Sequence, residues 1–516
     1  MERIKTEFET QVSMETESIP SPDDPPFHIL FLGDFSGREN LAAVTDAPLV
    51  NSKPVEIDRD NFDDVLRNFN TSLRLKLEGV SEEPILLGFN EFEDFHPDKI
   101  FERVSVFADL RDVRRRLLND VTYEQAAQEV RGWFEKAEPN VTVSAEESIV
   151  SEDNTSSSTG NLLEDILEQK SVGSAEYRES APVSGELGSF VRSIVKPYLV
   201  ETDFGAQAEL LKIVDEAVSG LMKRLLNHTD FKALEAAWRG LYFLVKNAQT
   251  NRDLKIFVLD VTKHEVCDKL KNIKELDYSE MFRMFDSELA ASSNGAPWSL
   301  LCANYEFELN VEDVAGLMRL AKIGSYCDAP FIASVKPQML GIEALGISPD
   351  YLKWNYTDET AEGKLWTMLR TIPEAMYLGL VLPRILARYP YGAQTEPTEL
   401  FEFEEFDDVF EHEDYLWFNP SFAIALLFAE TFSVSGWEMK GKMLNELEGL
   451  PVHIYENDGE TIIKPTTEIV ISESALNILV EQGLMVLLTL SKTDKVRLPY
   501  FQSVAFPERS LKGRWG

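Results

Sequence analysis

A polar stretch at residues 138–190 divides this sequence into two blocks that are rich in apolar residues. The stretch contains SAEESIVSEDNTSSSTG and SAEYRESAPVSGELGS, in which Ser, Glu and Gly predominate. Such a composition buries too little apolar surface to offset the entropy lost on ordering the chain. We therefore predict a solvated linker between two folded regions.

Strand-like and helix-like patterns alternate in the first block. FHILFL at 27–32 is followed by DNFDDVLRNF, then EPILLGF, then HPDKIFERVSVFADLRDVRRRLL. Apolar residues recur every second residue or in short runs in the strand-like pieces and every third or fourth residue in the helical ones. This alternation favours an α/β unit over residues 27–120.

The second block continues the same alternation. Helical spacing of apolar residues covers 210–225 and 231–245, and LKIFVLDV at 254–261 is typical of a buried strand. DVAGLMRLAKIGSYCDAPFIASV predicts a helix and then a strand, and MYLGLVLP, SFAIALLFAETF and HIYE predict strand, helix and strand. The predicted fold class is therefore α/β, with mixed sheets and packed helices over residues 206–516.

Residues 2–12 alternate with strand period, with Ile4, Phe8 and Val12 on one face. The Pro-rich stretch SIPSPDDPPF then separates this segment from the next strand. An isolated terminal strand stays paired only by adding to a sheet. We expect residues 1–20 to pair either within this subunit or with a neighbouring one.

One apolar helix is predicted inside the polar region 121–205. In NLLEDILEQ at 161–169, Leu162, Leu163, Ile166 and Leu167 share a helical face, and Asn161 can cap the helix. This face either docks on its own domain or binds another protein.

The charge balance excludes several classes of partner. The 516 residues include 89 acidic and 50 basic side chains, a net charge of −39. A surface this negative repels nucleic acid and anionic lipid, and the cluster Arg114 to Arg116 is too small to reverse that. Without a signal-like start or a membrane-length apolar run, and with three scattered cysteines, the sequence predicts a cytoplasmic protein.

Motifs for enzyme chemistry are lacking in the sequence. No P-loop or GxGxxG is present, and in Gly33-Asp34-Phe35-Ser36-Gly37 the serine is one place too late for a nucleophile elbow. We interpret this segment as a turn after a buried strand, in which Asp34 and Ser36 bond to the loop backbone. His264 and Cys267, three residues apart, lack a third partner.

The acidic segment around His412 is the strongest candidate for metal-dependent hydrolysis. Its possible oxygen ligands are Glu405, Asp407, Asp408, Glu411, Glu413 and Asp414. The spacing of a calcium loop and its turn glycine are absent, however, and such charge runs are usually solvated loops. We therefore expect no catalytic residues, no metal site and no cofactor, with the hydrolase kept as an alternative that His412→Ala tests.

Several segments resemble the large sheath subunit of the bacterial type VI secretion system, in that family's order. They are LLEDILEQ, FKALEAAWRGLYFLVKN, LKIFVLDV, CDAPFIASV, YLGLVLPRILARYPYG, YLWFNPSFAIA, GLPVHIY and KPTTEIVIS. FHILFLGDFSGREN, IDRDNFDDVL and FEDFHPDKIFERVSVFADLRDVRRRL are similar to the small sheath subunit. The chain thus resembles a fusion of the two subunits.

The resemblance implies a structural protein rather than an enzyme. Such subunits polymerise in the cytoplasm around an inner tube, on a baseplate, and the sheath shortens to eject the tube. Terminal strands are exchanged between protomers, a role that Ile4, Phe8 and Val12 suit. A short helix near the start of the large subunit is bound by an AAA+ unfoldase that dismantles contracted sheath, and Leu162, Leu163, Ile166 and Leu167 match it.

The sequence departs from this family at its end. The large subunit normally continues beyond an SVQKP-like segment, whereas this sequence closes with QSVAFPERSLKGRWG. Another polypeptide then supplies the segment, or the protein polymerises without it. Alternatively, the protein is a non-contractile accessory, cap or baseplate adaptor of a polymer made by other subunits.

Overall fold

The computed structural model describes residues 25–41, 53–77, 80, 83–135, 207–271, 285, 296–407, 409–457, 459–490 and 492–515. Packing divides the chain into two compact units, and each is described by itself. Unit 1 contains residues 1–77, 83–105 and 219–516, and unit 2 contains residues 78–82 and 106–218. The predicted domain limits at 27–120, 121–205 and 206–516 stay a prediction.

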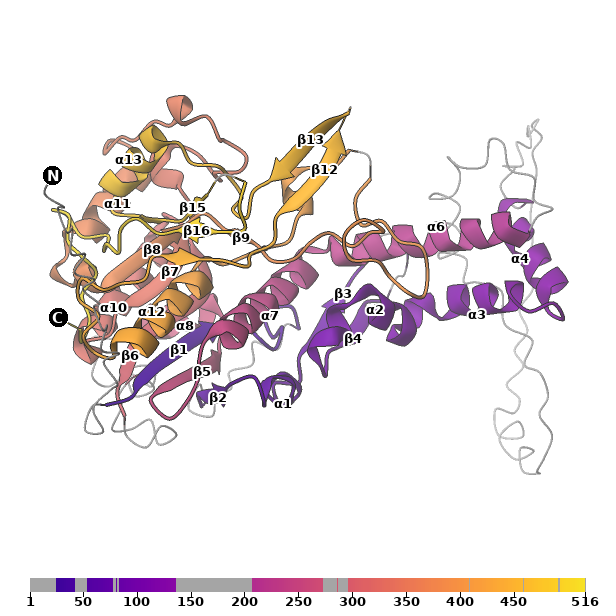
Figure 1. Ribbon diagram of the computed structural model, residues 1–516, viewed down its shortest axis with the longest axis horizontal. Helices are drawn as coiled ribbons and strands as arrows, with labels where there is room; N and C mark the ends of the chain where they lie inside the picture. Colours follow the sequence, from indigo (N-terminus) through magenta and orange to yellow (C-terminus); the bar gives the residue numbers. More distant parts are fainter. Residues whose placement is uncertain are drawn as a thin grey trace, which may run out of the picture. The chain divides into compact units, whose positions relative to one another are not determined.

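A seven-stranded sheet forms the centre of unit 1 (Figure 1). In spatial order its strands are β14 (Met485–Val486), β8 (Leu378–Leu382), β7 (Phe331–Val335), β6 (Trp298–Phe307), β1 (Phe27–Gly33), β5 (Leu254–Asp260) and β2 (Val55–Ile57). All neighbours are parallel except β2, which runs antiparallel to β5. The first block of the sequence therefore supplies a central strand to a sheet built mostly by the second block.

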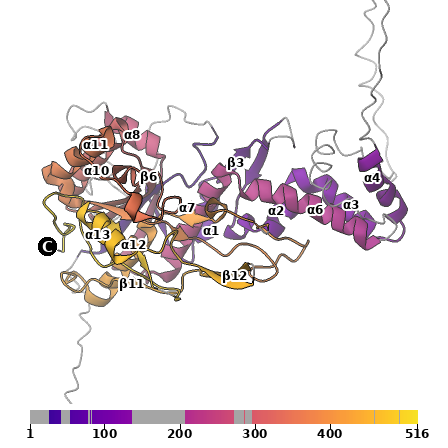
Figure 2. The ribbon, with the colours of Figure 1, turned by 90° about the horizontal axis from the view of Figure 1, so that it is seen from above.

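Helices cover both faces of this sheet. They are α7 (Thr229–Asn247), α8 (Lys263–Lys271), α10 (Val311–Cys327), α11 (Ala361–Thr371), α12 (Ser421–Ser435) and α13 (Glu473–Glu481). Figure 2 shows α8 and α10 on one side of the strands and α12 on the other. Because both faces are covered, the strands are continuous apolar runs rather than alternating ones, as β1 with its seven buried residues illustrates.

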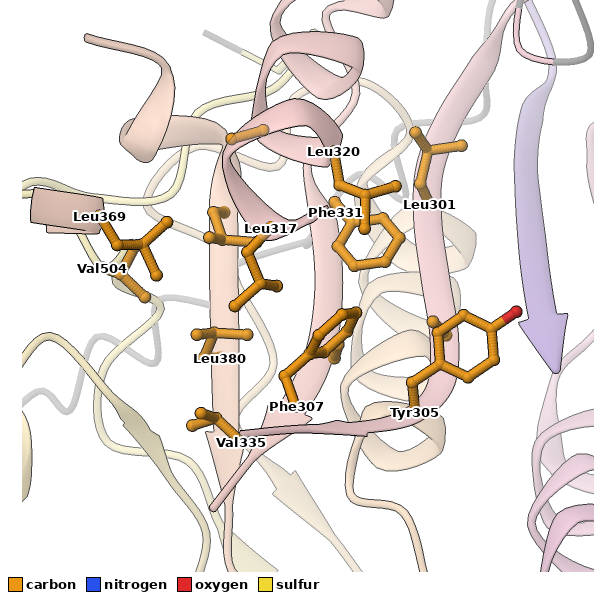
Figure 3. Close-up of a cluster of buried hydrophobic side chains, with 14 of the residues drawn as sticks. Leu301, Tyr305, Phe307, Leu317, Leu320, Phe331, Val335, Leu369, Leu380 and Val504 are labelled. Carbon is orange, nitrogen blue, oxygen red and sulfur yellow. The ribbon is translucent and has the colours of Figure 1, made fainter. Parts of the chain in front are cut away.

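Successive residues of β1 contribute to the two layers in turn. Leu30 and Leu32 belong to the core cluster under α10, while Phe31 stacks on Phe422 of α12 with ring centroids 4.1 Å apart. Figure 3 shows Leu317 and Leu320 of α10 directed onto the strand residues of this core cluster. The helix α12 is buried almost all round because it lies between this sheet and α7.

The remaining elements of unit 1 are shorter. The small sheets are β3 (Ser72–Leu75) with β4 (Ile85–Gly88), β9 (Ile385–Leu386) with β10 (Trp417–Phe418), β11 (Glu446–Leu447) with β16 (Val496–Arg497) and β15 (Leu488–Thr489), and β12 (His453–Asn457) with β13 (Glu460–Lys464). The short helices are α1 (Phe62–Asn68), α2 (Pro97–Arg103), η2 (Phe92–Phe95), η6 (Gln338–Leu340), η7 (Tyr351–Lys353), η8 (Pro373–Tyr377) and η9 (His412–Asp414).

Unit 2 contains helices. Its elements are α3 (Ala108–Leu117), α4 (Tyr123–Glu135) and the first part of α6 (Gln207–Leu226), whose last residues belong to unit 1. Arg114 pairs with Asp215 across α3 and α6 at 2.7 Å, and Arg116 pairs with Glu129 of α4 at 2.6 Å. Buried side chains such as Leu110 and Val130 complete a helical core.

The α/β class and the main elements predicted from the sequence are confirmed. Strands occur at β1, β5, β7, β8 and β12, and helices at α1, α6, α7, α10 and α12. The predicted helical stretch 96–118 differs in detail, because Val104 is extended and separates α2 from η3 (Ser105–Phe107) and α3. Residues 2–12 and 161–169 lie outside the described residues, so their predicted strand and helix stay predictions.

The loop after β1 has the predicted turn. Asp34 accepts backbone hydrogen bonds from Gly37, Arg38 and Glu39. Gly37 has φ +76°, and a Cβ there would lie 2.4 Å from the Ser72 carbonyl oxygen, so glycine is required. Ser36 bonds to Asp260 at the end of β5 rather than within its own loop.

We expect His28 to make stability depend on pH. His28 is buried in β1, and burial together with the charge of Lys255 lowers its pKa from 6.5 to about 4. In the unfolded chain the His28 imidazole takes up a proton near pH 6.5, whereas in the folded chain it stays neutral down to about pH 4. The contribution of His28 to the free energy of unfolding is therefore fully present above pH 6.5 and is lost as the pH falls toward 4. Between pH 7 and 5.5 the loss should be about 1 kcal/mol.

The measurement is urea unfolding of the wild type and of His28→Phe over pH 7 to 5.5, above the sequence pI of about 4.5. The variant should lose this part of the pH dependence, whereas His264→Gln, at an exposed position, should keep it. Parallel curves for the wild type and His28→Phe would contradict the assignment.

Candidate functional site

The acidic segment around His412 forms an ion-pair network. His412 Nε2 lies 3.4 Å from Glu468, and its Nδ1 lies 2.9 Å from Lys464 Nζ. The imidazole also stacks on Trp417, with ring centroids 4.9 Å apart. Arg384 binds both Glu468 and Glu413. Both ring nitrogens of His412 therefore already have protein partners.

Most described carboxylates of this segment are also occupied. Glu405 binds Arg388, Asp407 binds Lys223 Nζ at 2.6 Å, and Asp414 caps the turn at Glu411. Within the described residues, no group of three or more His, Cys, Asp or Glu side chains is placed to hold a metal ion. Asp408 lies outside those residues. The arrangement therefore favours structural ion pairing over metal chemistry at this segment.

Glu468 is the buried centre of the network. Burial alone would raise its pKa, but the hydrogen bond with His412 and the charge and hydrogen bonds of Arg384 lower its pKa to about 2. The carboxylate thus stays charged and joins the segment after β13 to the segment after β8.

The other sequence candidate does not form a site. His264 is exposed on α8, whereas Cys267 is buried against Gly316 of α10. A Cβ added at Gly316 would lie 2.7 Å from the Cys267 sulfur, so these helices pack closely. Cys267 is therefore a packing residue.

A fully buried network connects α7 with the segment after β9. Arg388 binds Glu235 through Nε at 2.8 Å and binds both oxygens of Glu405 at 2.6 and 2.8 Å. These three side chains are at most 5% exposed. Arg239 binds Glu235 at 2.6 Å and donates to the Tyr391 hydroxyl at 2.9 Å.

The charges in this network hold one another ionised. Burial raises the pKa of Glu235 in isolation, yet Arg388 and Arg239 reverse the effect and leave the pKa below its usual value. This network was not predicted from the sequence. The sequence carries one sign of it, because Glu235 lies within the apolar helical pattern FKALEAAWRGLYF, where a buried charge without a partner would be costly.

The two-stranded sheet β12–β13 presents apolar side chains to solvent. Ile454 is 58% exposed and Ile463 39% exposed. Among the described residues, no further strand pairs with either β12 or β13. Open strand edges with exposed apolar side chains are suited to accept another strand.

The residues predicted for partner binding cannot be placed. Ile4, Phe8 and Val12, and Leu162, Leu163, Ile166 and Leu167, lie outside the described residues. In the described part of the chain, no helix combines the length and the apolar character needed to cross a bilayer.

Two family models of sheath-related proteins match different regions of this chain. Residues 208–505 match VipB, described as EvpB/VC_A0108, tail sheath N-terminal domain. Residues 1–140 match T6SS_VipA, described as type VI secretion system, VipA, VC_A0107 or Hcp2. Because the first match covers more than half of the chain, the protein belongs to the VipB tail-sheath family, with a VipA-like region preceding it.

A curated relative supports the same family. The chain is 35% identical over 307 residues to the type VI secretion system sheath protein TssC1 of Pseudomonas aeruginosa. The aligned region covers 58% of this chain, and the chain spans 61% of the relative's length.

Proposed function

We propose that this protein is a structural subunit of the contractile sheath of a type VI secretion system. In this proposal it polymerises around an inner tube in the cytoplasm, and contraction of the polymer drives the tube outward. The observation that carries the proposal is the position of β1. This strand, from the VipA-like region, lies between β5 and β6 of the VipB-like region, so both regions act as one building block.

The described structure supports a role in assembly rather than in catalysis. The candidate for chemistry, His412, is engaged by Glu468 and Lys464. Work in such a protein would come from repacking between subunits. Its proposed partners are other sheath subunits, the inner-tube protein, the baseplate and an AAA+ unfoldase.

Deleting residues 1–20 should leave a folded subunit that no longer polymerises. In this proposal the apolar face of the terminal strand pairs with a neighbouring subunit, for which the edges of β12–β13 are suitable. Sedimentation and electron microscopy measure the loss of polymers. As a matched control, replacing Ile4, Phe8 and Val12 by Ser should abolish polymers, whereas replacing Lys5, Glu7 and Glu9 should not. Tubes formed by the deletion variant would show that the strand pairs within its own subunit.

Leu163→Asp with Ile166→Asp should abolish capture by the cognate unfoldase without unfolding the protein. These charges would replace the apolar face of the proposed helix, whose polar surroundings in the sequence favour an exposed position. A pull-down with the purified unfoldase measures binding, and Glu164→Gln with Asp165→Asn on the opposite face is the matched control. Equal capture of the wild type and the Asp variant would remove this helix as the binding element.

A further inference from the structure

A cavity of about 410 Å³ opens in unit 1 where the VipA-like and VipB-like regions meet. Its lining residues come from η2 and the start of α2, from α7, and from the loop after β9: Phe92, Glu93, His96, Arg239, Tyr391, Thr395, Glu396 and Pro397. The hydrogen bonds from the Glu399 and Leu400 backbone to Asp98, at 2.9 and 3.1 Å, hold the two sides together. The cavity is therefore a feature of the joined chain.

The inner wall of the cavity is aromatic and held in place. The rings of His96 and Tyr391 meet edge to face with centroids 5.1 Å apart. The Arg239 guanidinium lies 5.4 Å from the centre of the Phe92 ring and is bound by Glu235 and by the Tyr391 hydroxyl. Burial alone would lower the pKa of Arg239, but Tyr391 and Glu235 raise it, so this guanidinium is charged and already neutralised.

Two further carboxylates line the cavity. Glu93 is exposed and Glu396 is half-buried. Within the described residues, neither side chain has a hydrogen bond or an ion pair. Behind the wall, Glu235 and Glu405 are balanced by Arg239 and Arg388, and Lys232 lies close enough to act on Glu405. The unbalanced negative charge at the cavity is therefore that of Glu93 and Glu396.

The loop that lines the cavity supplies no cation of its own, because residues 389–439 contain no Lys or Arg. Carboxylates further along this segment are paired elsewhere, as Asp407 is with Lys223 and Glu413 with Arg384. Aromatic rings next to carboxylates favour a cation, because the ring faces and the carboxylates both attract positive charge. A long basic side chain fits a cavity of this volume.

We propose that this cavity binds a lysine or arginine side chain presented by a separate, basic protein. The carboxylates of Glu93 and Glu396 favour a basic partner. A second copy of this chain is the less suitable source, because Arg114 and Arg116 of its densest basic cluster are already paired with Asp215 and Glu129. This site goes beyond the proposed sheath function and does not depend on contraction.

The test uses the full-length protein and capped pentapeptides with Arg, Lys or Gln between Gly-Ala and Ala-Gly. Binding is measured by saturation-transfer NMR titration. The Arg and Lys peptides should bind and the Gln peptide should not. Glu93→Gln with Glu396→Gln should weaken binding about tenfold, because two partly exposed charge pairs are lost. Glu399→Gln, on the same loop but outside the lining, should change the affinity less than about twofold.

Two outcomes would overturn the proposal. The first is binding of the Gln peptide as tight as that of the Arg peptide, or equal weakening by the Glu399 control. The second outcome concerns which protein supplies the basic side chain. Sedimentation velocity of the protein alone measures it. Self-association that is lost in the Glu93→Gln, Glu396→Gln variant would identify a second copy as the occupant, whereas unchanged sedimentation supports a separate partner.

Discussion

Replacing Arg388 by alanine should lower the free energy of unfolding by about 3–5 kcal/mol, because it leaves two buried carboxylates without their shared cation. Arg388 is 5% exposed, and Glu235 and Glu405 are 0% and 4% exposed. Water that enters the space left by the side chain can donate hydrogen bonds to these oxygens but does not supply the positive charge that the guanidinium provides. The shift is measured as the change in the urea midpoint.

An exposed ion pair provides the matched control. Arg497 and Glu446 are each more than 40% exposed, so Arg497→Ala should cost less than about 1 kcal/mol. The double variant Arg388→Met, Glu405→Gln removes one cation and one anion, leaves Glu235 paired with Arg239, and should recover much of the lost stability. If Arg388→Ala and Arg497→Ala shift the midpoint equally, the buried network does not stabilise the fold.

Phe31→Ala should destabilise unit 1 by about 3–5 kcal/mol, although Phe31 belongs to the VipA-like region. Its ring is fully buried and stacks on Phe422 of the VipB-like region. Because β1 is hydrogen-bonded to β5 on one side and to β6 on the other, the loss of stability should extend to strands more than two hundred residues away in the sequence.

Hydrogen exchange distinguishes a shared core from two separate ones. In Phe31→Ala, amides of β6 and β7 should lose protection together with those of β1. Leu86→Ala, at a position that is 69% exposed on β4, should leave both sets unchanged. Faster exchange confined to residues 25–105 would mean that the two regions fold independently.

The sequence was sufficient to predict where strands and helices occur along the chain, but not which strands pair with one another in the sheet. FHILFL and LKIFVLDV identify strands that are covered on both faces, because their apolar runs are unbroken. The same runs do not specify that β1 lies between β5 and β6. That order depends on pairing between residues such as Phe31 and Val258, which are far apart in the chain.

The candidate sites were harder to predict for a related reason. The charges around His412 are visible in the sequence, but the partners Lys464 and Glu468 come from β13 and the segment that follows it. The cavity likewise requires η2, α7 and a loop near residue 395 to meet. Ile4, Phe8, Val12 and the helix at 161–169 stay predictions from pattern and resemblance.

Electron microscopy of the purified full-length protein tests the central claim most directly. It is imaged alone and then with the inner-tube protein and any neighbouring sheath proteins. We predict regular tubes in which each repeating unit contains both the VipA-like and the VipB-like region. Discrete particles that only join or cap tubes made by other subunits would identify an accessory instead, and particles that never associate with tubes would contradict a role in the sheath.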